Sequence, residues 1–288
     1  MNLAEETKFI MKKYNITANK NYGQNFLIDE NIVNDIITGA QVNKDDLIIE
    51  IGPGLGTLTS LLLEKAGKVI CVELDKKMIN VLKERFILYN NFELLNNDIL
   101  KVDLNRLISE SKTNLKNVKV VANLPYYITT PIIMKLLEDK LDLTSITVMV
   151  QKEVAERLAG INGGKEIGSI TYSINYYTNP EIIINVPRNS FIPAPNVDSA
   201  VIKFDILKEP KIKVSNEELF FKVIKFSFLQ KRKTLINSLS NSGLVSKESL
   251  EKILNDLNID LKIRAEQLTL EQFGKISDYI YSNNKQSV

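Results

Sequence analysis

A glycine-rich segment, Glu50-Ile-Gly-Pro-Gly-Leu-Gly-Thr-Leu-Thr59, carries the residue types that most directly suggest ligand chemistry. It follows a short apolar run and precedes a helix-periodic one, as at the first strand-to-helix crossover of an open α/β sheet. Gly52, Gly54 and Gly56 allow a tight turn and let a ligand approach the backbone. Glu50 adds a negative charge before the loop, which favours a ligand that bears a cation.

Two classes of cofactor use such a loop, and the spacing distinguishes them. Dinucleotide sites follow G-x-G-x-x-G/A, with a pyrophosphate at the helix N-terminus. Here Thr57 occupies the position that a dinucleotide fold makes small and apolar, and Glu50 would repel a pyrophosphate. S-adenosylmethionine carries a sulfonium and an ammonium, so the sequence favours it over NAD.

Two acids fall at the ends of the next two apolar runs. Glu73 ends the second run, and Asp98 follows the third in Asn97-Asp98-Ile99. A carboxylate at position 73 can accept hydrogen bonds from both ribose hydroxyls, and one at position 98 can accept from an adenine amino group. For either acid alone, a solvated carboxylate at a strand end is the favoured interpretation, but together, after the glycine loop, they predict a nucleoside-bearing cofactor.

The segment Asn123-Leu-Pro-Tyr-Tyr127 has the chemistry needed to activate an exocyclic adenine amine. That nitrogen is a poor nucleophile because its lone pair is delocalised into the ring. If its N–H groups donate to the Asn123 side-chain oxygen and to a backbone carbonyl near Leu124, the nitrogen becomes more pyramidal and more nucleophilic. Pro125 holds the local backbone, and Tyr126 can stack on the base. We therefore expect catalysis by positioning and electrostatics, with no acid or base.

Phe191, in the Pro-framed segment Phe191–Ala200, is the candidate for a second wall of the base pocket. A base extruded from RNA needs such a wall. The alternative interpretation of an isolated aromatic residue is that it packs in the core.

The absence of histidine narrows the possible chemistry further. The chain has no histidine and one cysteine, which excludes His-based acid–base catalysis, serine-type triads and a zinc cluster. We expect no metal. Cys71 lies inside an apolar run, so it is interpreted as a core residue and not as a nucleophile towards pyrimidine carbon.

Strand-like and helix-like segments alternate between residues 47 and 150, which predicts an α/β fold with a parallel sheet covered on both faces. The expected strands are Leu47–Ile51, Val69–Glu73, Phe92–Asn96, Val118–Ala122 and Ile146–Val150, and the expected helices are Thr57–Lys65, Lys76–Tyr89 and Thr130–Lys140. Ile182–Val186 and Ala200–Ile206 are expected to form an antiparallel pair at the sheet edge.

Beyond Lys208 the pattern becomes helical throughout. Ser215 or Asn216 caps an expected helix that runs towards Ser240, Ser246 caps a second, and Thr269-Leu-Glu-Gln272 is a capping box for a third. We therefore expect a catalytic domain over residues 1–207 and a helical domain for RNA binding and substrate recognition over residues 208–288.

The charge is unevenly distributed, although the formal net charge is only +2. Residues 201–240 hold nine basic residues against four acidic ones, so the remainder is slightly acidic. Such a block favours contact with a phosphate backbone, and the alternative is a solvated lysine-rich helix. No transmembrane or signal segment is indicated, so we expect a cytoplasmic protein, and we expect it to be a monomer.

These motifs together resemble the small-subunit ribosomal RNA adenine dimethyltransferase family, whose loss gives kasugamycin resistance. The resemblance runs from about Lys20 to Gln272. The matching pieces are Gly23-Gln-Asn-Phe-Leu27, the Glu50–Thr59 loop, Glu73, Asp98, Asn123–Tyr127, Phe191–Ala200, Gln230-Lys-Arg-Lys-Thr234 and Arg264-Ala-Glu-Gln-Leu268.

The resemblance implies a Rossmann-like, seven-stranded class I methyltransferase fold with a small helical C-terminal domain. It implies transfer of two methyl groups to each of two adjacent adenosines in the hairpin near the 3′ end of small-subunit (16S) RNA, within a pre-ribosomal particle. The positions that match the family's cofactor contacts are Asn25, Leu27, Gly52, Glu73, Asp98 and Asn123. Asn123 through Tyr126, with Phe191, match its base pocket. The basic cluster departs from the family, because many members carry more arginine than Gln-Lys-Arg-Lys.

Three other functions remain as alternative interpretations of the sequence. The sister group that methylates large-subunit (23S) RNA and confers macrolide resistance has a similar catalytic domain, but Leu124 and Arg264–Leu268 resemble the small-subunit group. Protein-glutamine and DNA adenine methyltransferases carry a proline where this chain has Leu124. The third is a pre-ribosome assembly factor in which RNA binding is primary and catalysis secondary.

The basic cluster Lys231, Arg232 and Lys233 generates a first prediction. Neutralising all three side chains is expected to weaken RNA binding and to flatten its dependence on salt, because fewer counterions are released on binding. The measurement is the dissociation constant for RNA over a series of salt concentrations. An unchanged salt slope would identify the cluster as a solvated face.

Overall fold

The computed structural model describes residues 1–19, 22–160, 167–230 and 232–286. The chain divides into two compact units. Unit 1 comprises Met1–Glu156 and Asn179–Ile206, and unit 2 comprises Arg157–Thr178 and Leu207–Val288. The helix α7 (Lys152–Ala159) and the strand β7 (Thr178–Val186) span the junctions.

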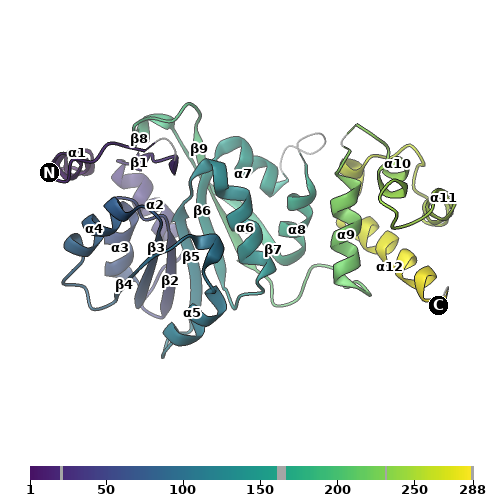
Figure 1. The fold of residues 1–288 in the computed structure, drawn as a ribbon, viewed down its shortest axis with the longest axis horizontal. Helices are drawn as coiled ribbons and strands as arrows, with labels where there is room; N and C mark the ends of the chain where they lie inside the picture. The colour runs from purple at the N-terminus through teal and green to yellow at the C-terminus, as the bar shows by residue number, and fades with distance from the viewer. Residues whose placement is uncertain (20–21, 161–166, 231, 287–288) are drawn as a thin grey trace. The chain divides into compact units, whose positions relative to one another are not determined.

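Unit 1 is built on a seven-stranded sheet in the order β4-β3-β2-β5-β6-β9-β7 (Figure 1). Its other strands are β2 (Asp46–Ile51), β3 (Lys68–Glu73), β4 (Phe92–Asn96), β5 (Asn117–Asn123), β6 (Ser145–Gln151) and β9 (Ser199–Ile206). The pairs β2–β3, β3–β4, β2–β5 and β5–β6 are parallel, whereas β6 and β9 are antiparallel. The predicted α/β class is therefore confirmed, and the late strands β9 and β7 are neighbours at one edge.

In unit 1, one helix precedes the first strand and the others lie in the connections between strands. They are α1 (Leu3–Lys13), α2 (Glu30–Gly39), α3 (Thr57–Lys65), α4 (Lys76–Arg85), α5 (Leu104–Ser111) and α6 (Thr129–Glu138), with short 3₁₀ turns η2 (Ile99–Lys101), η3 (Tyr126–Ile128) and η5 (Arg188–Ser190). The predicted helix Thr57–Lys65 has the observed bounds of α3, whereas α4 ends at Arg85 and not at Tyr89.

Both faces of the sheet are buried, as its near-continuous apolar strands require. Ile48, Val69 and Cys71 belong to one core cluster together with side chains of α1 to α4. Leu47 and Ile70, which alternate with them along the strands, are equally inaccessible to solvent. A separate two-stranded sheet pairs β1 (Phe26–Leu27) with β8 (Phe191–Ile192), so that Leu27 lies opposite Phe191.

Unit 2 is entirely helical in its described residues and has its own aromatic core. Its elements are α8 (Ser169–Tyr177), α9 (Glu217–Ser227), α10 (Leu235–Ser240), α11 (Lys247–Asp256), η6 (Ala265–Gln267) and α12 (Leu270–Gln286). Ser246 caps α11, and the paired hydrogen bonds of the Thr269–Gln272 capping box are formed.

The observed units differ from the expected division at residue 207, because α8 groups with unit 2. Tyr172 and Tyr176 of α8 are buried in the core of that unit. The Tyr172 hydroxyl donates to the backbone carbonyls of Leu268 at 2.7 Å and Ala265 at 3.2 Å. The hydrophobic face of α8 therefore packs on helices that follow it by many residues, a pairing that local periodicity does not reveal.

The single helix expected from Asn216 towards Ser240 is wrong. The chain forms α9 and α10 with a break between them, because the Thr234 side chain accepts a hydrogen bond from the Asn237 backbone and starts a new helix. Lys231 of the predicted basic cluster is outside the described residues, while Arg232 and Lys233 are exposed.

The continuous basic block expected over residues 201–240 also needs correction. Lys203 lies on β9 in unit 1, is only 8% exposed and forms an ion pair with Asp205 at 3.0 Å. Lys213 and Lys222 of unit 2 form ion pairs with Glu209 and Glu218. Lys203 therefore belongs to a structural network, and only the exposed members can contact a polyanion.

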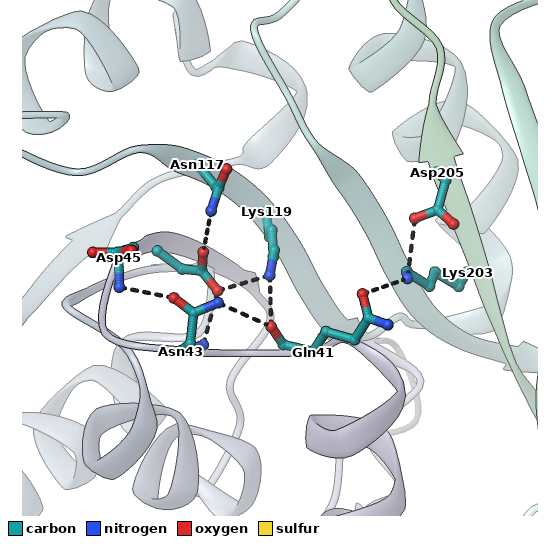
Figure 2. A network of polar contacts seen from close by, with 8 residues as sticks. Gln41, Asn43, Asp45, Asn117, Lys119, Lys203 and Asp205 are labelled. Atoms are coloured by element: carbon teal, nitrogen blue, oxygen red, sulfur yellow. Dashed lines mark hydrogen bonds and ion pairs between the residues drawn. The ribbon is translucent and has the colours of Figure 1, made fainter.

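That network joins the amino-terminal ends of β2 and β5 to β9 (Figure 2). Lys119 of β5 forms an ion pair with Asp46 of β2 at 2.8 Å, and both side chains are buried. Lys119 also donates to the backbone carbonyl of Gln41, whose side-chain oxygen accepts from Lys203. The Asn117 amide donates to the second Asp46 oxygen. The buried charges of Lys119, Asp46 and Lys203 are thus all paired.

Lys119 provides a stability prediction with a matched control. Lys119→Met leaves the Asp46 carboxylate buried without its cation, so we expect a loss of about 3–5 kcal/mol in the free energy of unfolding. Lys116→Met removes the exposed ion pair with Asp45 on the same strand region and is expected to change stability little. Urea denaturation followed by circular dichroism checks both variants. Equal effects would mean that the buried pair contributes no more than the surface one.

Candidate functional site

A cavity lies at the carboxyl ends of the parallel strands, where open α/β sheets bind ligands. Its wall comes from residues 22–27, the glycine loop, the ends of β3 and β4, and the segment after β5. The structure brings the following predicted residues together on this wall: Asn25, Leu27, Glu50, Gly52, Gly54, Glu73, Asp98, Asn123, Leu124, Pro125 and Tyr126.

The glycine loop presents its backbone to the cavity in a left-handed conformation. Gly52 and Gly54 have φ of 65° and 56°, which other residues adopt only with strain. The Gly54 amide donates to a carboxylate oxygen of Glu73 at 3.2 Å, and the Gly52 amide donates to the Val72 carbonyl. The loop is therefore fixed to the end of β3 by its own backbone.

Gly56 does not line the cavity, in contrast to its expected place among the cofactor contacts. It has φ of 86° and is the N-cap that precedes α3. A Cβ added to it would lie 2.6 Å from Cε2 of Phe86, the residue that follows α4 as its C-cap. A glycine is needed there because the backbone turns sharply and because Phe86 packs against it.

Glu73 is held at the end of β3 by backbone donors. One carboxylate oxygen accepts from the Asp75 amide at 2.8 Å, and the other accepts from the Gly54 amide. Burial raises the pKa of Glu73, and these two hydrogen bonds oppose that shift. Each oxygen keeps a further lone pair, so the carboxylate can still accept hydrogen bonds from a pair of vicinal hydroxyls.

Asp98 uses only one carboxylate oxygen for the protein itself. That oxygen caps η2 by accepting from the Leu100 amide at 3.0 Å. The second oxygen has no protein donor among the described residues, and the side chain lines the cavity. It can therefore accept a hydrogen bond from a ligand amine.

Glu50 is buried beneath the loop and does not form an exposed negative edge. It is 1% exposed, and its Oε2 accepts from the Thr59 hydroxyl at 2.6 Å and from the Cys71 thiol at 3.3 Å. Burial raises the pKa of Glu50 to about 7. Burial also raises the pKa of the Cys71 thiol, and Cys71 is fully buried, which confirms its interpretation as a core residue.

Asn123, the last residue of β5, has a defined amide orientation. Its Nδ2 donates to the backbone carbonyl of Asn25 at 3.3 Å, which leaves the side-chain oxygen as the acceptor on the cavity wall. The Leu124 amide is engaged by the Met149 carbonyl, while no described residue donates to the Leu124 carbonyl. The Pro125 carbonyl, in contrast, accepts from Ile128 and Thr129. Among the described residues, two acceptors therefore remain at adjacent positions of the chain.

Tyr126 follows these acceptors and is anchored at its far end. Its hydroxyl lies 2.7 Å from the hydroxyl of the fully buried Ser199 on β9. Burial raises the pKa of the Tyr126 phenol, so the ring is neutral at physiological pH. The ring is held in place while its side chain lines the cavity.

Phe191 is not part of the cavity wall, in contrast to the expected second wall of a base pocket. It is 3% exposed and belongs to the core cluster under α1 to α4. Its backbone pairs with Leu27, so it supports the wall from behind. Phe191 is therefore a core residue in this structure, as the alternative interpretation of an isolated aromatic residue holds.

The N-terminal strap, residues 22–27, contributes more of the wall than the sequence indicates. Besides Asn25 and Leu27, it places Tyr22 and Gln24 on the cavity, and Gln24 donates to the Asp75 side chain at 3.0 Å. The strap residues lie far from the glycine loop in the sequence. Only the motif Gly23–Leu27 could therefore have predicted that they line the cavity.

Two further wall residues, Leu74 and Tyr127, carry exposed apolar side chains. Leu74 is 48% exposed and Tyr127 is 60% exposed. Each directly follows a predicted site residue, which is the signal that could have found them. Among the described residues, no cluster of histidine, cysteine and acidic side chains could hold a metal ion.

None of the helices in the described part of the chain combines the length and apolar character that a membrane crossing requires.

The chain is similar to known proteins over nearly its whole length. A family model described as ribosomal RNA adenine dimethylase matches residues 15–282. A ribosomal RNA small subunit methyltransferase A of Clostridium botulinum (strain ATCC 19397 / Type A) is 52% identical over 275 residues, covering 96% of this chain and 98% of that protein.

Solved structures share the fold. A dimethyladenosine transferase from Plasmodium falciparum is 27% identical with a TM-score of 0.74, covering 91% of this chain and 98% of that one. The 23S rRNA methyltransferase ErmE is 24% identical with a TM-score of 0.70, covering 89% of this chain and all of that one, and it supports the fold alone. The seven-stranded methyltransferase fold is thereby confirmed.

Glu50 predicts a pH dependence of stability. Because burial raises the pKa of this carboxyl from 4.5 to about 7, the folded state binds the proton more tightly than the unfolded chain. Folding therefore loses stability as pH rises between these values, by roughly 3 kcal/mol at full ionisation. Glu50→Gln removes this titration. The melting temperature of the variant minus that of the parent should therefore increase as the pH rises from about 5 to about 8.

The melting curves are recorded by circular dichroism on protein without added ligand. Glu64→Gln, at an exposed position on α3, is the control and should follow the parent at every pH. A Glu50→Gln difference that does not vary with pH would contradict the assigned titration.

Proposed function

The chain belongs to the ribosomal RNA adenine dimethylase family, and we propose that it transfers methyl groups from S-adenosylmethionine to N6 of two adjacent adenosines in the 3′-terminal hairpin of small-subunit (16S) rRNA. The product is N6-dimethyladenosine, and the reaction serves ribosome biogenesis. The observation that carries the proposal is the Asn123 amide, whose oxygen remains an acceptor beside the free Leu124 carbonyl.

The donor set at the glycine loop fits the proposed cofactor. Glu73 has lone pairs left for two ribose hydroxyls, and Asp98 has one carboxylate oxygen left for an adenine amine. The exposed Leu74 side chain, also on the cavity wall, offers an apolar face for the adenine ring. Glu50 has no basic partner among the described residues, so a cationic ligand group would compensate its charge.

When bound, S-adenosylmethionine supplies an electrophilic methyl group on a sulfonium that is already a good leaving group. The chain's own residues act on the acceptor. The Asn123 side-chain oxygen and the Leu124 carbonyl accept the two N–H bonds of the adenine amine, which localises the nitrogen lone pair. The Tyr126 ring stacks on the base and favours the positive charge that develops on nitrogen. The methylated amine then gives its proton to water, so no histidine is needed.

The small-subunit target is favoured over the large-subunit alternative. The relative that is 52% identical carries a small-subunit name, whereas the large-subunit enzyme ErmE is similar at the level of the fold. Leu124 and Arg264–Leu268 also resemble the small-subunit group. An assembly role through RNA binding is compatible with this reaction.

We further propose that unit 2 contributes to RNA recognition through exposed basic residues such as Arg232 and Lys233. The protein acts as a monomer in the cytoplasm, where a buried thiol such as Cys71 stays reduced.

Asn123→Ala tests the proposed mechanism. It removes one of the two acceptors, so we expect turnover to fall by 100-fold or more, on the order of the loss of one preorganised hydrogen-bonding group. Binding of S-adenosylhomocysteine, measured by calorimetry, is expected to stay near the parent value. Asn105→Ala, an exposed asparagine on α5, is the matched control and should retain full turnover.

The assay uses immature small-subunit particles and labelled S-adenosylmethionine, with mass analysis of the rRNA nucleosides. Appearance of N6-dimethyladenosine supports the proposed function. Label in large-subunit RNA would favour the sister group. Near-normal turnover by Asn123→Ala would overturn the role of the amide.

A further inference from the structure

The two exposed apolar side chains on the cavity wall lie in different parts of it. Leu74 follows Glu73 at the end of β3, and Tyr127 follows Tyr126 in η3. By chain position, Leu74 belongs with the proposed cofactor contacts, whereas Tyr127 belongs with the acceptor contacts. The proposed mechanism gives a task to Leu74 but none to Tyr127.

Tyr127 is not a core residue. Its side chain is 60% exposed, and among the described residues no group forms a hydrogen bond with its hydroxyl. Its neighbour Tyr126 differs on both points, because it is partly buried and its hydroxyl contacts Ser199. Neither packing nor hydrogen bonding within the protein therefore accounts for an aromatic residue at position 127.

The N-terminal strap nevertheless supports the Tyr127 ring on one side. A Cβ placed on Gly23 would lie 3.4 Å from Cδ1 and 3.7 Å from Cε1 of Tyr127, and 3.7 Å from Cβ of Pro125. Gly23 has φ of 59°. Gly23 thus lies close to one edge of the ring, while Tyr127 as a whole is 60% exposed on the cavity wall.

An exposed aromatic ring beside the proposed base pocket can bind a second nucleic-acid base by stacking. Extrusion of one adenosine removes the stacking partner of the nucleotide next to it. An aromatic side chain can replace that partner, and stacking of a base on an aromatic ring tolerates different base identities.

We propose that Tyr127 is a substrate-binding residue that stacks on the nucleotide adjacent to the adenosine held between Asn123 and Tyr126. The proposal rests on the proposed function and extends it to the second nucleotide. Where two adjacent adenosines are substrates, each is the neighbour of the other in turn. One ring can therefore serve both methylation events.

Three substitutions separate stacking from bulk. Tyr127→Ala removes the ring, Tyr127→Leu keeps an apolar side chain without an aromatic plane, and Tyr127→Phe keeps the ring. We expect kcat/KM for small-subunit particles to fall roughly 10-fold or more in the Ala and Leu variants, mainly through KM. The Phe variant should stay within a factor of about two, because the ring and not the hydroxyl is used. Leu88→Ala, 88% exposed and away from the cavity wall, is the control.

A spectroscopic signature tests the contact itself. Particles are prepared whose rRNA carries 2-aminopurine in place of one of the two adenosines, and fluorescence is recorded with S-adenosylhomocysteine present. Stacking should quench the emission with the parent and Tyr127→Phe, and not with Tyr127→Ala or Tyr127→Leu. Binding of S-adenosylhomocysteine alone should be the same for all four proteins, which verifies their folding.

The outcomes distinguish this proposal from the one on which it rests. If the parent fails to methylate small-subunit particles, the proposed function fails. If the parent methylates them and Tyr127→Ala keeps both its KM and its quenching, only the stacking role is overturned. A Leu variant that behaves like the parent would likewise overturn it, because bulk would then suffice.

Discussion

The parallel register of β2, β3, β4 and β5 is the constraint on which the rest of the site depends. Parallel strands end at the same edge, and in this sheet those ends carry the glycine loop, Glu73, Asp98 and Asn123. No single one of these groups would bind a ligand strongly. Their convergence follows from backbone pairing that is specified far from the cavity by buried apolar strands.

The N-terminal strap completes the cavity wall that the strand ends form in part. Its pairing with β8 holds Leu27, and the Asn25 carbonyl accepts from Asn123. This one hydrogen bond decides which end of the amide is an acceptor, because the nitrogen is occupied by the protein itself. The strap also backs Tyr127 through Gly23. Residues from the start of the chain therefore control the direction of groups placed by β5.

Buried charges are compensated differently at the amino-terminal and carboxyl-terminal ends of the strands. At the amino-terminal edge, Lys119 and Asp46 are paired and hydrogen-bonded, which suits a structural element. At the carboxyl ends of the strands, Glu50 has only neutral donors among the described residues, Thr59 and Cys71, and burial raises its pKa. Burial of the Glu50 carboxyl beside the cavity without a cation from the described residues lowers the stability of the fold locally. Such a cost is typical of sites where ligands bind.

The sequence by itself determined the α/β class, the positions of β2 to β6 along the chain, the bounds of α3 and most of the cavity wall, because these depend on local periodicity and on short motifs at strand ends. Only the tertiary structure decided that Gly56 and Phe191 face the core, that Glu50 is buried, that Lys203 is paired and that α8 joins the helical unit. It also decided that Tyr22, Gln24, Leu74 and Tyr127 reach the wall. The reason is physical: a motif states which side chains are present near a strand end, whereas the face on which each one lies, and the partner that it meets, depend on segments distant in the chain that pack against it.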